Sequence, residues 1–159
     1  MKNLFTICIC LLTAAYLTGC IQSNESYLNE RASILKLKDL PENPLLLHPL
    51  TSSINPNDST MATLYGNDLA MGHAQVYKGS DFPAGAVLYQ VTWKQKKDSL
   101  WFGANIPAKV LSVEQISFDD HKNAVYKLYK GDKLRESNRE NVAPERVDLI
   151  ISQKMAVSP

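Results

Sequence analysis

Cysteine is the residue type in this chain with the widest chemistry, because thiols bind metals, form disulfides, act as nucleophiles and carry lipids. All three cysteines of the 159-residue chain, Cys8, Cys10 and Cys20, lie near its amino terminus. An apolar stretch from Leu4 to Leu17 leads into the segment Leu17-Thr18-Gly19-Cys20. This order is typical of a secretory signal that has small residues before its cleavage site.

The segment that ends in Cys20 resembles a lipobox, at which bacterial lipoproteins are cut before the cysteine and acylated on it. We therefore expect residues 1–19 to be a signal peptide and membrane lipid to be a partner through the acylated Cys20. The expected location is the cell envelope, lipid-anchored, because two or three acyl chains hold a protein stably on a bilayer. Ile21, in place of an aspartate, favours an outer membrane in a host that has one. The alternative is an apolar membrane anchor that is never cleaved.

The charge balance excludes several classes of function. The chain has 17 basic and 16 acidic residues, and removal of the signal with Lys2 would make it formally neutral. A neutral domain of this size lacks the basic surface of a dedicated nucleic-acid binder, so no nucleic-acid partner is expected. Cys20 would be the sole cysteine left, which excludes disulfides within the chain, thiolate catalysis and cysteine-ligated zinc.

Histidine is the other residue type with chemical potential, and the chain has three: His48, His73 and His121. His121 belongs to a dense cluster, Asp119-Asp120-His121, which could attract a divalent cation. Consecutive residues on a turn point in different directions, however, and do not complete a coordination shell. We predict a solvated turn there, no metal site and no catalytic residue.

The elements that must position these residues are mostly short strands. Alternating apolar residues and turn signals predict a single α+β domain over residues 59–159, a mainly antiparallel sheet with one or two short helices. Asn67 is the expected N-cap of one helix, which continues to Val76. Residues 133–141 could be a solvated helix or a loop, and periodicity does not assign residues 146–157. The expected strands are 60–65, 86–93, 100–106, 110–118 and 124–130.

Residues 20–58 are expected to form a lipid-anchored tether and a proline-rich strap. Residues 27–37 could form a short helix, and the prolines that follow it rule out one regular element. Leu45, Leu46 and Leu47 are too apolar for water, so we expect them to pack onto the domain.

Aromatic residues gather on or beside the expected hairpin of residues 86–106. We expect them to line one side of the sheet, either as core or as a pocket for a flat or small apolar ligand. The basic cluster Lys94-Gln95-Lys96-Lys97 is expected at the hairpin tip, where it keeps the tip soluble or contacts lipid headgroups or a partner protein. The candidate pocket residues are Tyr65, Tyr89, Trp93, Trp101 and Phe102.

Five segments carry a resemblance to a known family: TMATLYGN at 60–67, FPAGAVL at 82–88, VTWKQ at 91–95, WFGANIP at 101–107 and RVDLIISQK at 146–154. Together they resemble the cytochrome P-460 family, in a lipoprotein-like branch, over roughly residues 50–159. Family members of known activity are periplasmic c-type haem proteins with a mainly antiparallel β fold, and some oxidise hydroxylamine. The resemblance thus implies a cytochrome P-460-like β domain and a haem.

The sequence departs from this family at the haem. Covalent c-type haem needs a Cys-x-x-Cys-His motif, which the chain lacks, so covalent haem is not supported. The family's haem-crosslinking lysine has no matching position either. A haem held without covalent bonds would need an axial ligand, for which His48, His73 and His121 are the candidates, with His73 preferred because it lies on the short helix. Two functions remain: a non-catalytic lipoprotein that binds a partner or small apolar ligand, or a haem-binding oxidoreductase that uses non-covalent haem.

Overall fold

A computed structural model describes residue 37 and residues 40–76, 79–131, 133–137 and 144–156 of the chain. The expected signal peptide, the lipidation site Cys20 and all but the last residue of the expected helix over 27–37 lie outside the described residues. In the described part of the chain, no helix has the length and apolar character needed to span a bilayer.

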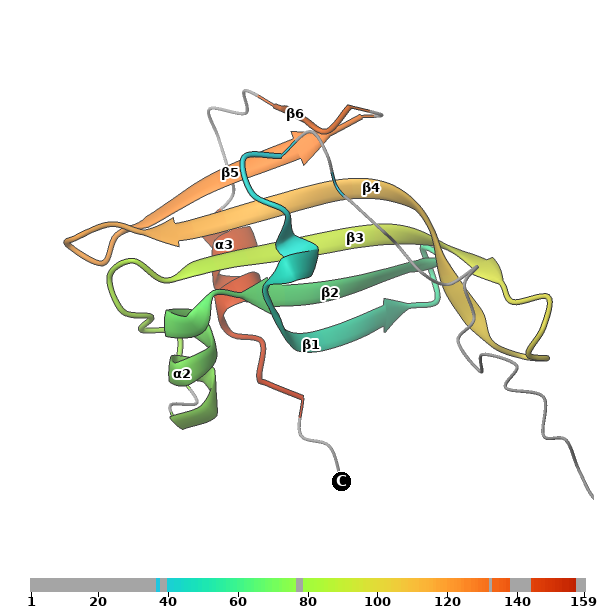
Figure 1. The fold of residues 1–159 in the computed structure, drawn as a ribbon, viewed down its shortest axis with the longest axis horizontal. Coiled ribbons are helices and arrows are strands. Elements are labelled where there is room, and N and C mark those ends of the chain that lie inside the picture. Colours follow the sequence, from blue (N-terminus) through green and yellow to red (C-terminus); the bar gives the residue numbers. More distant parts are fainter. Residues whose placement is uncertain (1–36, 38–39, 77–78, 132, 138–143, 157–159) are drawn as a thin grey trace, which may run out of the picture.

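The centre of the domain is one six-stranded antiparallel sheet whose strands follow one another in chain order (Figure 1). β3 and β4 are its longest strands and lie in the middle, where each pairs with a neighbour on both sides. The strands are β1 (His48–Asn55), β2 (Thr60–Gly66), β3 (Val87–Lys97), β4 (Asn105–Phe118), β5 (Ala124–Lys130) and β6 (Arg135–Glu136).

Both faces of the sheet are covered, which makes three layers. One face carries α2 (Asp68–Val76) and α3 (Pro144–Ile151), and the other carries the strap, which here means Leu37 and residues 40–47 with the 3₁₀ turn η2 (Pro44–Leu46) (Figure 1). β3 shows why both faces are apolar: Leu88 packs with the helices, whereas its neighbour Tyr89 packs with the strap. Successive strand residues point to opposite faces, so one apolar strand supplies two cores.

The α+β single-domain prediction is confirmed, and Asn67 is the N-cap of α2. Its Oδ1 accepts the backbone N–H of Ala70 at 3.0 Å, and its Nδ2 donates to the carbonyl of Gly85 at 2.9 Å. Asn67 therefore fixes both the start of the helix and the loop that leads into β3.

The sheet begins at His48 rather than at Ser59, so the second half of the expected strap is a strand. Pro49 and Pro56 made a strand appear unfavourable from the sequence alone. Pro49 lies at the start of an edge strand, next to an irregularity in the β1–β2 register, and a proline is tolerated at such a position. Leu50, the next residue, is buried against the helix layer.

Two further expectations are corrected. One strand, β4, replaces the expected strands 100–106 and 110–118, and residues 100–104 belong to the turn before it. Pro107 does not interrupt β4, because this part of the strand pairs only with β3 and its missing N–H is not needed for a second neighbour. A register shift near Trp93 also places Val110 on the strap face. Leu45 and Leu47 of the strap pack onto the sheet as expected, but Leu46 faces outward from the 3₁₀ turn.

The two unassigned segments at the carboxyl end are also resolved. Residues 135–136 form the short strand β6, and residues 144–151 form α3, whose Ile150 is fully buried against the sheet. Residues 138–141 of the expected helix or loop lie outside the described part of the chain.

Candidate functional site: a groove beneath the strap

The five predicted aromatic residues do not lie together. Tyr65 and Tyr89 are directly opposite each other on β2 and β3, and both pack on the strap face with Trp93. Trp101 and Phe102 lie in the turn between β3 and β4, beyond the sheet, and are exposed. The prediction of a common side therefore holds for three residues and is wrong for two, because the turn carries those two away from both cores.

Tyr65 and Trp93 line a groove of about 370 Å³ on the strap face. Its apolar wall joins segments that are far apart in the sequence, and Ser52, Ser53 and Thr63 add hydroxyls to it. The Oγ of Ser52 and the Oγ1 of Thr63 are hydrogen-bonded to each other at 2.8 Å. We call this the strap groove; its remaining lining residues are Leu45, Ile54, Met61, Ala62 and Pro107.

Trp93 brings an unusual feature to the strap groove. Its side chain is buried, and its indole Nε1–H has no hydrogen-bond acceptor among the described residues. An unpaired buried donor is unfavourable by about 1–3 kcal/mol. A ligand acceptor atom next to this nitrogen would satisfy the donor.

The tyrosines beneath the strap are held in their neutral form. Burial raises the pKa of Tyr89, and the nearby carboxylate of Glu42 adds to this effect. Burial also raises the pKa of Tyr65, which a hydrogen bond with Thr63 partly offsets. These phenols are therefore neutral ring surfaces at physiological pH and supply no base.

The helix face carries a polar cluster that sequence reasoning did not identify. Glu114 of β4 is only 4% exposed, and both of its carboxylate oxygens are paired with Arg146 of α3. Arg146 donates from Nε to Oε1 at 2.7 Å and from Nη2 to Oε2 at 2.5 Å, while the Tyr126 hydroxyl donates to Oε1 at 2.7 Å. The pairing raises the pKa of the guanidinium. The sequence did contain a signal for this cluster, because Glu114 is a charged residue at a core-facing position of an alternating strand.

Beside this cluster lies a second, polar hollow of about 500 Å³. Gln90 of β3 is buried there and accepts a hydrogen bond from Gln153 at 2.5 Å. Two pairs of its lining side chains bond to each other, Gln153 with Gln90 and Asn55 with Asp58, so the hollow is a polar seam between α3 and the sheet. The hollow is lined by Ser53, Asn55, Asp58, Thr60, Met61, Ala62, Gln90, Thr92, Ser112, Arg146, Leu149 and Gln153.

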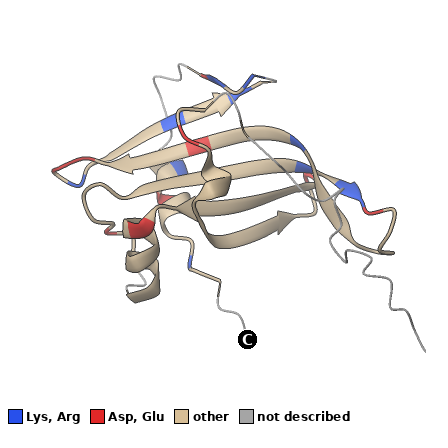
Figure 2. Cartoon of the chain, in the orientation of Figure 1, with Lys and Arg blue, Asp and Glu red and all other residues tan. Residues whose placement is uncertain are grey.

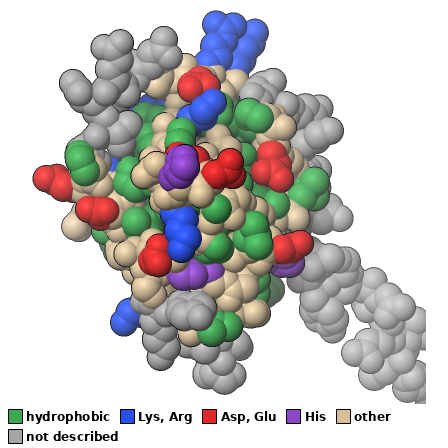
Figure 3. Space-filling view, turned by 90° about the vertical axis from the view of Figure 1, so that its left-hand side faces the viewer, with side chains coloured by type: hydrophobic (Ala, Val, Ile, Leu, Met, Phe, Trp, Pro, Cys, Tyr) green, Lys and Arg blue, Asp and Glu red, His purple; other side chains and the backbone are tan. Residues whose placement is uncertain are grey.

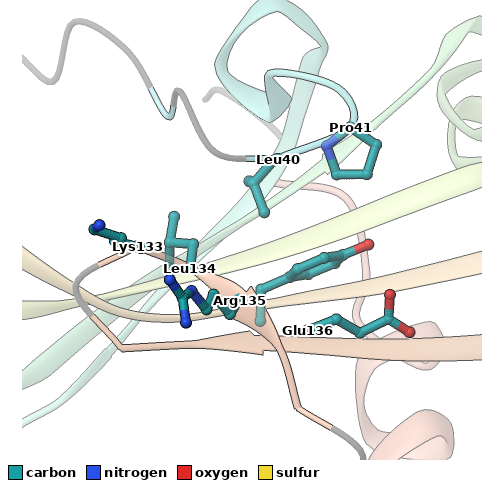
Figure 4. Close-up of a pocket in the computed structure, with 7 residues that line it drawn as sticks. Leu40, Pro41, Lys133, Leu134, Arg135 and Glu136 are labelled. Carbon is teal, nitrogen blue, oxygen red and sulfur yellow. The ribbon is translucent and has the colours of Figure 1, made fainter.

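A third hollow, of about 530 Å³, lies between the strap and the end of the sheet (Figure 4). Leu40 and Pro41 of the strap lie over Leu134 and Arg135, with Lys133 and Glu136 on opposite sides. It is a shallow surface depression with mixed charges, and its geometry singles out no reaction.

The three histidines lie on three different elements: β1, α2 and the turn between β4 and β5. His48 pairs with Asp68 at 2.7 Å, and His73 packs against Phe82 with ring centroids 4.5 Å apart. His121 lies in the turn between β4 and β5, where Asp119 accepts its backbone N–H at 2.9 Å. The described residues contain no cluster of three or more histidine, cysteine or acidic side chains that could hold a metal.

The turn between β4 and β5, which contains Asp119-Asp120-His121, is exposed to solvent as expected. Asp119 also accepts the backbone N–H of Asn123 at 2.8 Å, and these bonds lower the pKa of its carboxyl group. Figure 3 shows this end of the molecule, where acidic, basic, histidine and apolar side chains are intermixed on one surface.

The residues predicted for a haem do not come together. His73 packs against Phe82, which belongs to the helix-face core, whereas Tyr65 and Trp93 belong to the strap face. The sheet therefore separates the predicted ligand from the predicted walls. The described residues do not fit a haem that His73 ligates and these aromatic rings enclose.

Comparison with protein-family models and with curated proteins found no match for this chain. The resemblance to the cytochrome P-460 family accordingly stays a prediction.

Proposed function

We propose that this chain is an envelope lipoprotein, anchored through acylated Cys20, whose cytochrome P-460-like β domain binds a small, flat, apolar ligand in the strap groove. The observation that carries the binding site is the strap groove itself, where the rings of Tyr65 and Trp93 meet Met61 and the strap residue Leu45. Apolar and aromatic walls with a few polar groups are the usual composition of a small-molecule site.

The lining of the strap groove supports binding rather than catalysis. Its described residues include no histidine, carboxylate, lysine or arginine, and the hydroxyls of Ser52 and Thr63 are paired with each other. A hydroxyl nucleophile needs an adjacent base, and the described lining offers none. The buried N–H of Trp93 favours a ligand with one acceptor atom over a pure hydrocarbon.

The experiment uses the full chain in detergent with Trp101→Phe, which leaves Trp93 as its single tryptophan. 6-Propionyl-2-(dimethylamino)naphthalene is the neutral, flat, largely apolar ligand, its ketone oxygen supplies the one acceptor, and energy transfer from Trp93 to it reports binding. We expect saturable transfer that is lost when Thr63→Phe is added, because the new ring fills the groove. The matched control is Val125→Phe, which adds a ring at an exposed position of β5 outside the groove.

Circular dichroism melting shows whether the Thr63→Phe variant is folded. Equal transfer in a folded Thr63→Phe variant and in the Val125→Phe control would place the dye elsewhere and refute the groove proposal. The haem-binding oxidoreductase is the alternative from the family resemblance. A Soret band that survives dialysis of the full chain and disappears with His73→Ala would favour it over the proposal.

The anchor is tested separately. We expect palmitate labelling of the wild-type chain and its loss in Cys20→Ala, because the thiol and the amino group of that residue are the acylated groups. Unchanged labelling and unchanged membrane partitioning in the variant would overturn the lipoprotein proposal.

A further inference from the structure

The turn between β3 and β4 displays three consecutive apolar side chains to solvent. Leu100 is 63% exposed, Trp101 is 61% exposed and Phe102 is fully exposed. We call these three residues the apolar tip. Large apolar groups that gather on a soluble surface indicate an interaction site.

The apolar tip is held away from both cores by the length of its hairpin. β2 pairs with β3 only as far as Lys94, and β5 pairs with β4 only from Ser112. Beyond these points, β3 and β4 pair only with each other and project past the sheet as a two-stranded arm (Figure 1). The apolar tip is therefore the outermost part of that end of the domain.

The turn that carries the apolar tip is well ordered by internal hydrogen bonds. The buried Asp98 accepts the backbone N–H of Leu100 at 2.8 Å, and its own backbone N–H donates to the carbonyl of Ala104 at 2.9 Å. Ala104 donates in turn to the carbonyl of Trp101 at 3.1 Å. Gly103 adopts a φ of 82°, which side-chain-bearing residues rarely adopt. The fold thus fixes these side chains outward instead of letting them collapse onto the arm.

The arm behind the apolar tip is basic. Lys94, Lys96 and Lys97 lie on β3 and Lys109 lies on β4, whereas Asp98 is the sole acidic residue between positions 94 and 109. Figure 2 shows these basic segments on the strands that lead to the apolar tip. The opposite end of the molecule has no such separation of charged and apolar groups (Figure 3).

We propose that the apolar tip inserts into the surface of an anionic bilayer, with Lys96 and Lys97 at the lipid phosphates. Tryptophan and phenylalanine favour the boundary between headgroups and acyl chains, and lysines next to them attract anionic lipid. The apolar tip lies outermost and the basic arm lies behind it, which matches the order of acyl chains and anionic headgroups in a membrane surface. A protein partner would not require this order. This proposal rests neither on the strap groove nor on Cys20.

The two tryptophans of the chain provide the test, because Trp93 is buried in the sheet and Trp101 lies in the apolar tip. The full chain with Trp93→Phe reports only on Trp101, and the full chain with Trp101→Phe reports only on Trp93. Each is mixed with vesicles of phosphatidylethanolamine and phosphatidylglycerol whose acyl chains are brominated near the headgroup. We expect quenching of Trp101 by about twofold or more, with a blue shift, and no quenching of Trp93.

Charge reversal tests the role of the lysines. In the Trp93→Phe background, Lys97→Glu should weaken the quenching of Trp101, whereas Lys122→Glu, an exposed change at the opposite end, should not. Equal effects of the two changes would overturn the proposed phosphate contact. The insertion proposal is overturned if acrylamide reaches Trp101 equally well with and without vesicles, or if protection of Trp101 requires added envelope proteins.

Discussion

The buried ion pair between Glu114 and Arg146 should be the main polar interaction that holds α3 on the sheet. Arg146→Met keeps most of the side-chain volume but removes both charge-assisted hydrogen bonds and leaves the Glu114 carboxyl group without its cationic partner at an almost fully buried position. Removing one partner of a buried pair destabilises a protein by about 3–5 kcal/mol. The Arg146 side chain is 37% exposed, so solvent screens part of the pair. We therefore expect a loss of about 2–3 kcal/mol in the free energy of unfolding.

Urea unfolding of the full chain, followed by circular dichroism, measures this loss. The Glu114→Gln/Arg146→Met double variant should be more stable than Arg146→Met alone, because a neutral amide is less unfavourable than an unpaired carboxylate in the same place. Arg135→Met removes an exposed arginine from β6 and serves as the control, with a change within about 0.5 kcal/mol. If Arg146→Met is as mild as this control, or is not rescued by Glu114→Gln, the pair does not hold α3 in the way described.

Gly66→Ala should destabilise the domain by about 1–3 kcal/mol in the same urea assay, because its Cβ would lie 2.8 Å from the Cβ of Ala70; an unchanged midpoint would contradict this close packing. Asn67→Ala should lose about 1 kcal/mol with the N-cap of α2, whereas Asn67→Asp, which keeps an acceptor, should lose less. Tyr89 should stay neutral at pH values above its ordinary pKa of 10.0, because burial raises its pKa in the folded state. The neutral phenol then contributes stability that is present below the ordinary pKa and is lost as the pH rises through the raised value. Ultraviolet difference absorbance measures the ionisation of the phenol, and Tyr89→Phe should remove one late-titrating phenol. Asp119 has a lowered pKa in the folded state, so its carboxylate contributes stability above the ordinary pKa of 3.8, and this stability is lost as the pH falls through the lowered value. Asp119→Asn should therefore make the melting temperature less sensitive to acid.

Local patterns were sufficient for much of the sheet. β3 and β5 alternate clearly, Asn67 carries the side chain that an N-cap needs, and residues 119–123 have turn chemistry. Each of these features depends on neighbours in the sequence, so the sequence predicts it. β1 was missed because its prolines argue against a strand, and only its place at the sheet edge makes them acceptable.

The candidate sites depended on contacts that no local pattern encodes. The sequence by itself determined that an aromatic face would exist, since Tyr89 and Trp93 share the parity of one strand. Only the tertiary structure decided that Trp93 joins Leu45 and Pro107 in a groove while Trp101 points to solvent, because the strap must fold across the sheet to make that wall. The pairing of Glu114 with Arg146, 32 positions apart, was decided in the same way. Alternation gives the face on which a side chain lies, but the segment that covers that face depends on how the whole chain packs.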